Sequence, residues 1–221
     1  MLYVFPAVLF AAFAAMVMAS PHVQPLRVRS RARIVHGHLR SRHGFADGSK
    51  ASWAGVRASR WPPFHYGTHQ ETDGELLGTV DGYPVRVAGY ECVTAGARHH
   101  YGLACVVLSY PVEWAEVRGE PVHSAARVPE HVPDGHRLGA VPDFDRAYQV
   151  YAEEPEAVAL VTGRTMASTM MAVPERFNWR ALDSAVLLWK RDGWSSADAL
   201  IASVRAVLEV LDPVLVGGRA S

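Results

Sequence analysis

The longest uncharged apolar stretch of the chain lies at its beginning. No charged residue occurs between Leu2 and Ala19. A helix rises about 1.5 Å per residue, so this stretch is just long enough to cross a hydrocarbon core of about 30 Å. The pattern therefore predicts a transmembrane helix over residues 1–20.

The charges around this stretch predict its orientation. No lysine or arginine precedes it, whereas Arg27, Arg29, Arg31 and Arg33 follow it before the first acidic residue, Asp47. Because basic residues stay on the cytoplasmic side, the N-terminus should lie outside and the following domain in the cytoplasm. The same arginines should contact anionic lipid at the membrane surface. We expect a single-pass protein of the inner (cell) membrane, with the lipid bilayer as its first partner.

A cleaved signal peptide is the alternative for the same segment. Val17-Met18-Ala19 before Ser20 satisfies the small-residue rule for cleavage, which would release the domain outside the membrane. A signal peptide normally has a basic region before its apolar part, and this chain has none there. The anchored interpretation is favoured, and cleavage is left open.

Apolar spacing divides the rest of the chain. Residues 21–59 combine a basic juxtamembrane helix, which ends at Gly44, with a linker rich in glycine, serine and alanine. Residues 60–213 form the folded domain, and residues 214–221 form a flexible tail. Alternation in ELLGTV, YPVRVAGYECV and YGLACVVLSYP predicts three strands of an antiparallel meander.

The second half of the domain mixes strands with helices. We expect a strand in DRAYQVYA, short helices in EEPEAVALVTG and RTMASTMMAV, and a hairpin of FNWRAL with AVLLWKRDG that turns at Asp183-Ser184. A longer helix, with Ser195 and Asp198 at its start, has apolar residues at every third or fourth position up to Pro213. The chain is thus predicted to be α+β, with a mainly antiparallel sheet packed by short helices and a long C-terminal helix.

The two cysteines bear on the cellular compartment. Cys92 and Cys105 lie in neighbouring predicted strands, and pairing centred between residues 98 and 99 would place them opposite one another. Opposed cysteines could form a disulfide in an oxidising compartment, whereas the cytoplasm would keep both thiols reduced. The sequence leaves this choice open.

Composition narrows the classes of function. The chain has 221 residues, of which 49% are hydrophobic and 20% are charged, so it can bury one core. Its formal net charge is zero, whereas a nucleic-acid-binding protein needs a broad basic surface. No nucleic-acid partner is therefore expected.

No known catalytic pattern marks a set of reactive side chains. The eleven histidines all precede residue 137, and their spacing does not suit metal ligands. His65 and His69 are four residues apart, but the intervening Gly67 argues against a regular helix that would place both on one face. No phosphate-binding loop, dinucleotide fingerprint or activated-serine motif occurs. We expect no catalytic residue, no metal and no cofactor.

One short motif resembles a known group of proteins. Phe144-Asp145-Arg146-Ala147-Tyr148-Gln149-Val150 is similar to the Phe-Asp-Arg-x-aromatic-x-Val stretch of uncharacterised actinobacterial membrane-anchored proteins. These proteins join an N-terminal transmembrane helix to a domain of unknown function, and the likeness covers residues 60–212. The resemblance implies an anchored α+β domain without assigned catalytic residues. Phe144, Asp145, Arg146 and Tyr148 are expected to be structural.

Together these features predict a membrane-anchored cytoplasmic domain that acts by interaction or regulation, without catalysis of its own. Its partner would be a membrane protein or a cytoplasmic protein. The alternative function is an extracytoplasmic metal-dependent hydrolase that uses loop histidines such as His65 and His69.

Overall fold

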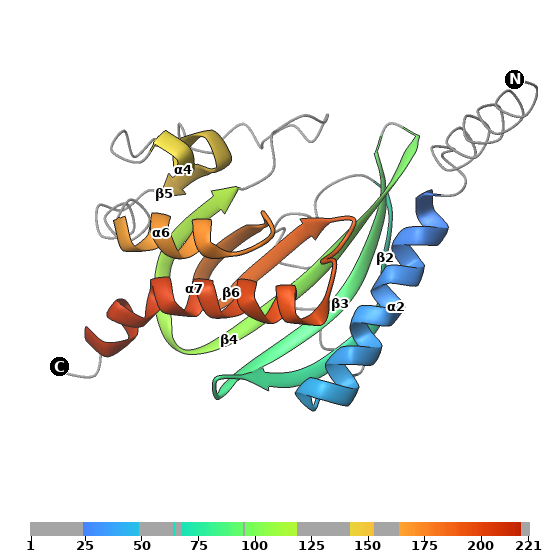
Figure 1. Cartoon of the computed structure of the whole chain (residues 1–221), viewed down its shortest axis with the longest axis horizontal. Coiled ribbons are helices and arrows are strands. Elements are labelled where there is room, and N and C mark those ends of the chain that lie inside the picture. Colours follow the sequence, from blue (N-terminus) through green and yellow to red (C-terminus); the bar gives the residue numbers. More distant parts are fainter. Residues whose placement is uncertain are drawn as a thin grey trace, which may run out of the picture.

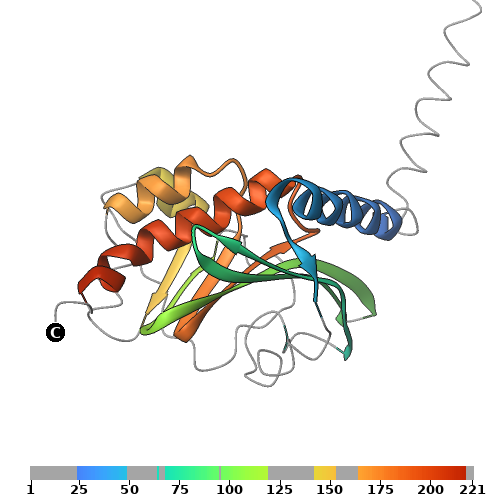
Figure 2. The ribbon, with the colours of Figure 1, turned by 90° about the horizontal axis from the view of Figure 1, so that it is seen from below.

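The computed structural model describes residues 24–48, 64, 68–94, 96–118, 142–152 and 164–217. Within these ranges one antiparallel sheet contains the strands β1 (Ala46–Asp47), β2 (Thr68–Val80), β3 (Tyr83–Thr94), β4 (Ala97–Arg118), β5 (Gln149–Ala152) and β6 (Asn178–Arg191). The helices are α2 (Gln24–His43), α4 (Pro142–Ala147), α6 (Arg164–Ala172) and α7 (Ala197–Gly217). All four lie on the same side of the sheet (Figures 1 and 2). The α+β class and the mainly antiparallel sheet are as predicted.

Strand β4 connects the two halves of the sheet. Its residues 97–106 pair with β3, and its residues 115–118 pair with β5 along the same edge. Strand β6 covers the opposite edge between residues 101 and 117. Register shifts around Val112 interrupt the regular β4–β6 ladder, and such irregularities allow a strand of 22 residues to bend while its pairing continues.

Helix α2 belongs to the core of the domain. Val35 and Leu39 are buried in the same apolar cluster as side chains of the sheet, and Phe45 joins that cluster directly after the helix. The ring of Phe45 fills the space that a side chain on Gly78 of β2 would need. The helix ends before Gly44, which has a φ of 70°, as expected. The structure differs from the expected division at residue 60, because α2 and β1 pack with the sheet.

Helix α7 covers the sheet with the apolar face that its spacing predicts. The buried residues of that face are Leu200, Ile201, Val204, Val207, Leu208 and Leu211. Ser196, not Ser195, caps the first turn, because its hydroxyl accepts a hydrogen bond from the Ala199 N–H at 3.0 Å. Pro213 does not end the helix, which continues to Gly217. A proline removes one helical hydrogen bond but leaves the following residues free to remain helical.

The register of the β3–β4 hairpin differs from the expected one. Cys92 lies opposite His99, and Cys105 lies opposite Arg86. The turn falls between Thr94 and Ala97, not at residues 98 and 99. The cysteines are therefore offset along the sheet, and both are buried free thiols.

Two other segments take a different secondary structure from the expected one. Residues 178–191 form the single strand β6 and not a hairpin. Asp183 has a φ of 54° at an irregularity of the β4–β6 ladder, so the chain deviates locally without reversing. In DRAYQVYA the first residues belong to α4, and only Gln149–Ala152 form a strand.

Several predicted elements lie outside the described residues. These are the transmembrane segment over residues 1–20, the linker after residue 48, the short helix over residues 153–163 and the end of the tail. In the part of the chain that the structure describes, no helix has both the length and the apolar character needed to cross a membrane.

Candidate binding cleft

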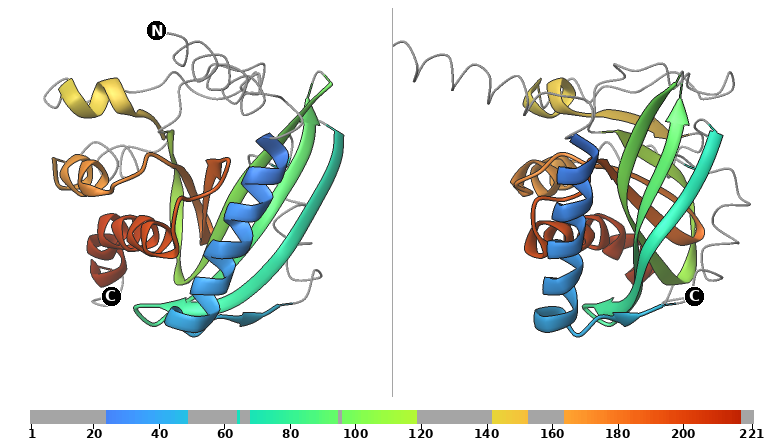
Figure 3. Two further views of the ribbon diagram at one scale, coloured as in Figure 1. Left: turned by 45° about the vertical axis from the view of Figure 1, so that its right-hand side comes forward. Right: turned by 90° about the vertical axis from the view of Figure 1, so that its right-hand side faces the viewer.

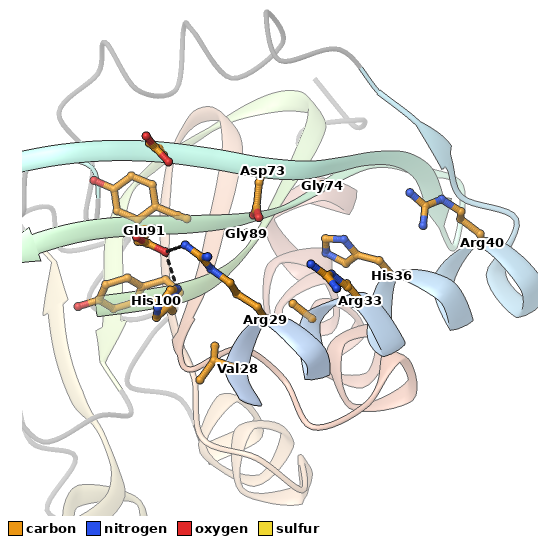
Figure 4. Close-up of a pocket in the computed structure, with 14 residues that line it drawn as sticks. Val28, Arg29, Arg33, His36, Arg40, Asp73, Gly74, Gly89, Glu91 and His100 are labelled. Atoms are coloured by element: carbon orange, nitrogen blue, oxygen red, sulfur yellow. Dashed lines mark hydrogen bonds and ion pairs between the residues drawn. The ribbon is translucent and has the colours of Figure 1, made fainter. Parts of the chain in front are cut away.

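A cleft of about 310 Å³ lies between α2 and the strands β2, β3 and β4. Figure 3 shows α2 running alongside the sheet over these strands. The second half of α2 is held by the buried Val35 and Leu39, whereas the smaller Val28 and Ala32 of its first half line the cleft. The polar lining side chains labelled in Figure 4 are Arg29, Arg33, His36, Arg40, Asp73, Glu91 and His100.

Glu91 of β3 is the centre of an ion-pair cluster in this cleft. Its carboxylate, with the side chain 14% exposed, accepts a hydrogen bond from Arg29 Nη2 at 2.8 Å and also pairs with Arg98. His100 Nδ1 lies 3.1 Å from the same carboxylate, because the antiparallel register places His100 directly opposite Glu91. One carboxylate therefore connects α2, β3 and β4 (Figure 4).

Burial and neighbouring charges act in opposite directions on Glu91. Loss of hydration raises the pKa of the carboxyl, but the hydrogen bond from Arg29, the adjacent imidazole of His100 and the charges of Arg29 and Arg98 outweigh this effect. The net result is a pKa below its usual value, so Glu91 is ionised at neutral pH.

His100 is held in its neutral form. Burial lowers the pKa of His100, and the charge of Glu91 only partly opposes this effect. A neutral ring that faces a carboxylate with Nδ1 donates from that nitrogen and leaves Nε2 as an acceptor. Nε2 is buried and has no hydrogen-bond partner among the described residues.

Two glycines allow α2 and the neighbouring strands to approach closely. Gly74 of β2 has a φ of 62°, and a Cβ there would lie 2.7 Å from His36 Nδ1. A Cβ on Gly89 of β3 would overlap the carboxylate of Asp73. Burial lowers the pKa of His36, with Asp73 opposing and Arg40 reinforcing the effect, so a second neutral imidazole lines the cleft.

The formal charges of the lining are balanced. Three arginines and three carboxylates contribute to it: Arg29, Arg33, Arg40, Glu71, Asp73 and Glu91. Glu91 pairs with Arg29, and Asp47 outside the cleft pairs with Arg40. Arg33 is exposed and makes no hydrogen bond or ion pair with any described residue. It is therefore the arginine of the cleft that is most available to another molecule.

The described lining residues combine ionisable side chains with two tyrosines. They include no serine, threonine or cysteine that the Glu91–His100 pair could activate as a nucleophile. Across the described ranges, no three histidine, cysteine, aspartate or glutamate residues are grouped as a metal site would require. Of the two histidines considered for such a site, His69 is exposed and His65 lies outside the described residues.

The arginines that the sequence assigned to the membrane surface have different positions. Arg29 is turned toward the sheet, because it pairs with Glu91, and its side chain is 47% exposed. Arg31 and Arg33 are exposed. Arg27 lies in α2, but its side chain is outside what the structure describes.

The residues of the family-like motif lie in and beside α4. Phe144 and Tyr148 are buried and their rings stack with centroids 5.0 Å apart. Burial raises the pKa of Tyr148 to about 12. Arg146 pairs with Asp143 at the surface, and Asp145 is half-buried. None of these residues lines the cleft.

Neither Glu91 nor Asp73 was predicted to be part of a site, and the histidines were predicted from their spacing not to be metal ligands. One signal was present for Glu91. It shares a strand face with Val85, Val87, Gly89 and Val93, and is the one charged residue among these five positions.

Fold and cleft together define the class of protein: an α+β domain in which a basic helix closes a charged cleft over an antiparallel sheet. Neither a protein-family model nor a curated protein matches the sequence. Among solved structures, the mycobacterial trehalose monomycolate transport factor A, TtfA, is similar with a TM-score of 0.55 and 15% sequence identity. The match covers 83% of this chain and 95% of TtfA. At this identity the likeness establishes a shared fold alone.

Proposed function

We propose that this protein is a membrane-anchored, non-catalytic domain on the cytoplasmic side that binds another protein at the cleft under α2. The observation that carries this proposal is the state of the ionisable groups in the cleft. Glu91 is ionised and occupied by Arg29, Arg98 and His100, so its charge serves to hold the elements of the cleft together. Arg33 at the same cleft stays available for a partner.

The membrane anchor in this proposal is the apolar stretch from Leu2 to Ala19, followed by arginines. Helix α2 begins at Gln24, only a few residues after that stretch, and packs into the domain core through Val35 and Leu39. An anchor at this place would hold the cleft close to the membrane.

The fold shared with TtfA favours an accessory role over an enzymatic one. TtfA is described as a transport factor for trehalose monomycolate. We carry over to this chain only the class of that role, an accessory factor in transport. The alternative of a metal-dependent hydrolase is supported by no observation on the described residues.

Site-specific photo-crosslinking of the full chain in intact cells tests the binding proposal. A photoreactive amino acid would replace Val28, which lines the cleft and leaves Arg33 in place, or, as a control, Arg176, an exposed residue between α6 and β6. We expect a discrete protein adduct in the membrane fraction from position 28, weakened by Glu91→Gln, and none from position 176. The same adducts from both positions would contradict binding at the cleft.

The location of the domain has a separate test. Ser184 is exposed on β6, whereas both native cysteines are buried, so Ser184→Cys introduces one reactive thiol. An impermeant thiol reagent should label this variant only after the cells are lysed. Labelling of intact cells would place the domain outside and overturn the cytoplasmic location.

A further inference from the structure

Helix α2 carries positive charge that the domain does not neutralise. Its 20 residues include no aspartate or glutamate. Arg29 and Arg40 are paired with Glu91 and Asp47. In contrast, Arg31 and Arg42 are exposed and form no hydrogen bond or ion pair with any described residue.

The same outer surface of α2 exposes a large apolar side chain. Ile34 is 58% exposed, the most of any large hydrophobic residue that the structure describes. It points away from the core that Leu39 contacts on the other side of the helix. Arg31 precedes Ile34 by three residues, so their side chains are neighbours on the helix surface. Unpaired arginines attract anionic headgroups, and an exposed apolar side chain beside them can enter the headgroup region.

The spacing of the two arginines gives this surface a direction. Arg31 and Arg42 are eleven residues apart, which is close to three helical turns, so both lie on the same side of α2. At about 1.5 Å per residue they are separated by roughly 16 Å along the helix axis. The pair therefore marks a line parallel to that axis.

We propose that the outer face of α2, formed by Arg31, Ile34 and Arg42, lies along an anionic lipid surface. The inference rests on the anchored location proposed above, since residues 2–19 would bring the start of α2 to the headgroups. Charge complementarity favours anionic lipid as the binding partner of this face. Arg31 and Arg42 place two positive charges three helical turns apart, and α2 contains no acidic residue. The core side of α2, with the sheet and α7, would then face away from the membrane.

An upright helix makes a different prediction from a helix that lies along the surface. Electrostatic attraction falls off within a Debye length, about 8 Å at physiological ionic strength. If α2 stood upright, Arg42 would be roughly 16 Å farther from the headgroups than Arg31 and would contribute nothing. If α2 lies along the surface, each arginine should change the ratio of lipid-bound to free helix about fivefold.

The experiment uses the full chain in lipid nanodiscs, with a nitroxide label on Ile34→Cys. The native cysteines are buried and should not react. A label on Met171→Cys of α6, another exposed apolar position, is the matched control. We expect the label at position 34 to be immobilised in nanodiscs containing 30% phosphatidylglycerol and mobile in pure phosphatidylcholine, and the label at position 171 to be mobile in both.

Charge variants then test the direction of the helix. Arg31→Gln and Arg42→Gln should each lower the ratio of immobilised to mobile label at position 34 about fivefold. Arg176→Gln, which removes an exposed arginine outside α2, should leave it unchanged. An effect of Arg31→Gln alone would show an upright helix, and no dependence on phosphatidylglycerol would exclude anionic lipid as the occupant. If the chain stays in the nanodisc, either of these two results refutes the contact between the outer face of α2 and anionic lipid. If the chain dissociates from the nanodisc, the proposed membrane anchor is refuted instead.

Discussion

Replacement of Glu91 by glutamine tests whether this carboxylate holds the first half of α2 on the sheet. The substitution keeps the size of the side chain and removes its charge. Arg29 and Arg98 then lose their ionic partner, and His100 loses a strong acceptor for its Nδ1–H. We expect the folded domain to be less stable and α2 to be held less firmly.

The size of the effect follows from the exposure of the partners. A hydrogen bond to a charged group contributes about 1.5–3 kcal/mol in a well-buried setting. The side chains of Arg29 and Arg98 are 47% and 54% exposed, so solvent screening reduces each pair to about 1 kcal/mol or less. The expected loss in the free energy of unfolding is therefore about 2 kcal/mol, equivalent to a decrease of about 4–8 °C in Tm for a domain of this size.

The dependence on pH gives the prediction a second signature. The pKa of Glu91 is lower in the folded state, so its stabilisation is complete above the ordinary pKa of 4.5 and is lost as the pH falls through the folded-state value. The difference in Tm between wild type and Glu91→Gln should therefore be largest at pH 7 and should narrow below pH 4.5. Thermal unfolding of the full chain in nanodiscs, followed by tryptophan fluorescence, measures both quantities.

Glu71→Gln is the matched control for this measurement. Glu71 lies on β2 directly opposite Glu91 and lines the same cleft, but it is exposed and makes no ion pair with a described residue. Its replacement should change the free energy of unfolding by less than about 0.5 kcal/mol. Equal effects of the two variants, or a loss at Glu91 that is the same at pH 7 and at pH 4, would refute the role assigned to Glu91.

Three further measurements test other parts of the structure. Both carboxylate oxygens of Glu75 are buried without a hydrogen-bond partner among the described residues, and burial raises its pKa. The Glu75 carboxyl therefore stays protonated to a higher pH in the folded state than in the unfolded chain, so the free energy of unfolding of the wild type should decline as the pH rises above 4.5. Glu75→Gln should remove that decline, which denaturant titrations at several pH values measure. Leu39→Ala should cost about 3 kcal/mol because Leu39 is fully buried between α2 and the sheet, whereas Ile34→Ala on the outer face should change stability by less than about 0.5 kcal/mol. Burial raises the pKa of Cys105 to about 11, so Cys105 and the equally buried Cys92 should react with a thiol reagent at pH 7.5 only after unfolding, and fast labelling of the native protein would contradict their burial.

Regular apolar spacing predicted the elements whose structure depends mainly on their own residues. The buried face of α7, including Leu200, Val204 and Leu211, repeats every three or four residues and packs on the sheet as expected. Alternation likewise predicted β2, β3 and β4 as neighbouring antiparallel strands. These patterns are local, so a single sequence is sufficient to recognise them.

Register and strand continuity depend on interactions that the local pattern does not contain. The β3–β4 turn lies three residues before the predicted position, because Gly96 with its φ of 78° accommodates a tight connection there. The residues Asp183-Ser184 have the composition of a turn, yet β4 supplies pairing partners on both sides of them and keeps β6 continuous. The pairing of β6 with β4 therefore outweighs the local preference of Asp183-Ser184 for a turn.

The cleft was not predicted because its residues come from elements far apart in the sequence, but the two halves of its ion-pair cluster are visible separately. Glu91 is a carboxylate on a strand face that is otherwise apolar or glycine, and a carboxylate on a covered face needs a cationic partner. Residues 24–43 supply arginines without any acidic residue to pair with them. Strand β3 has a carboxylate that needs a cation, and α2 has arginines that need an anion. The two observations together therefore indicate that α2 packs next to β3. Arg29 supplies the cation that Glu91 needs, whereas Arg31 and Arg42 of the same helix are exposed and have no acidic partner among the described residues.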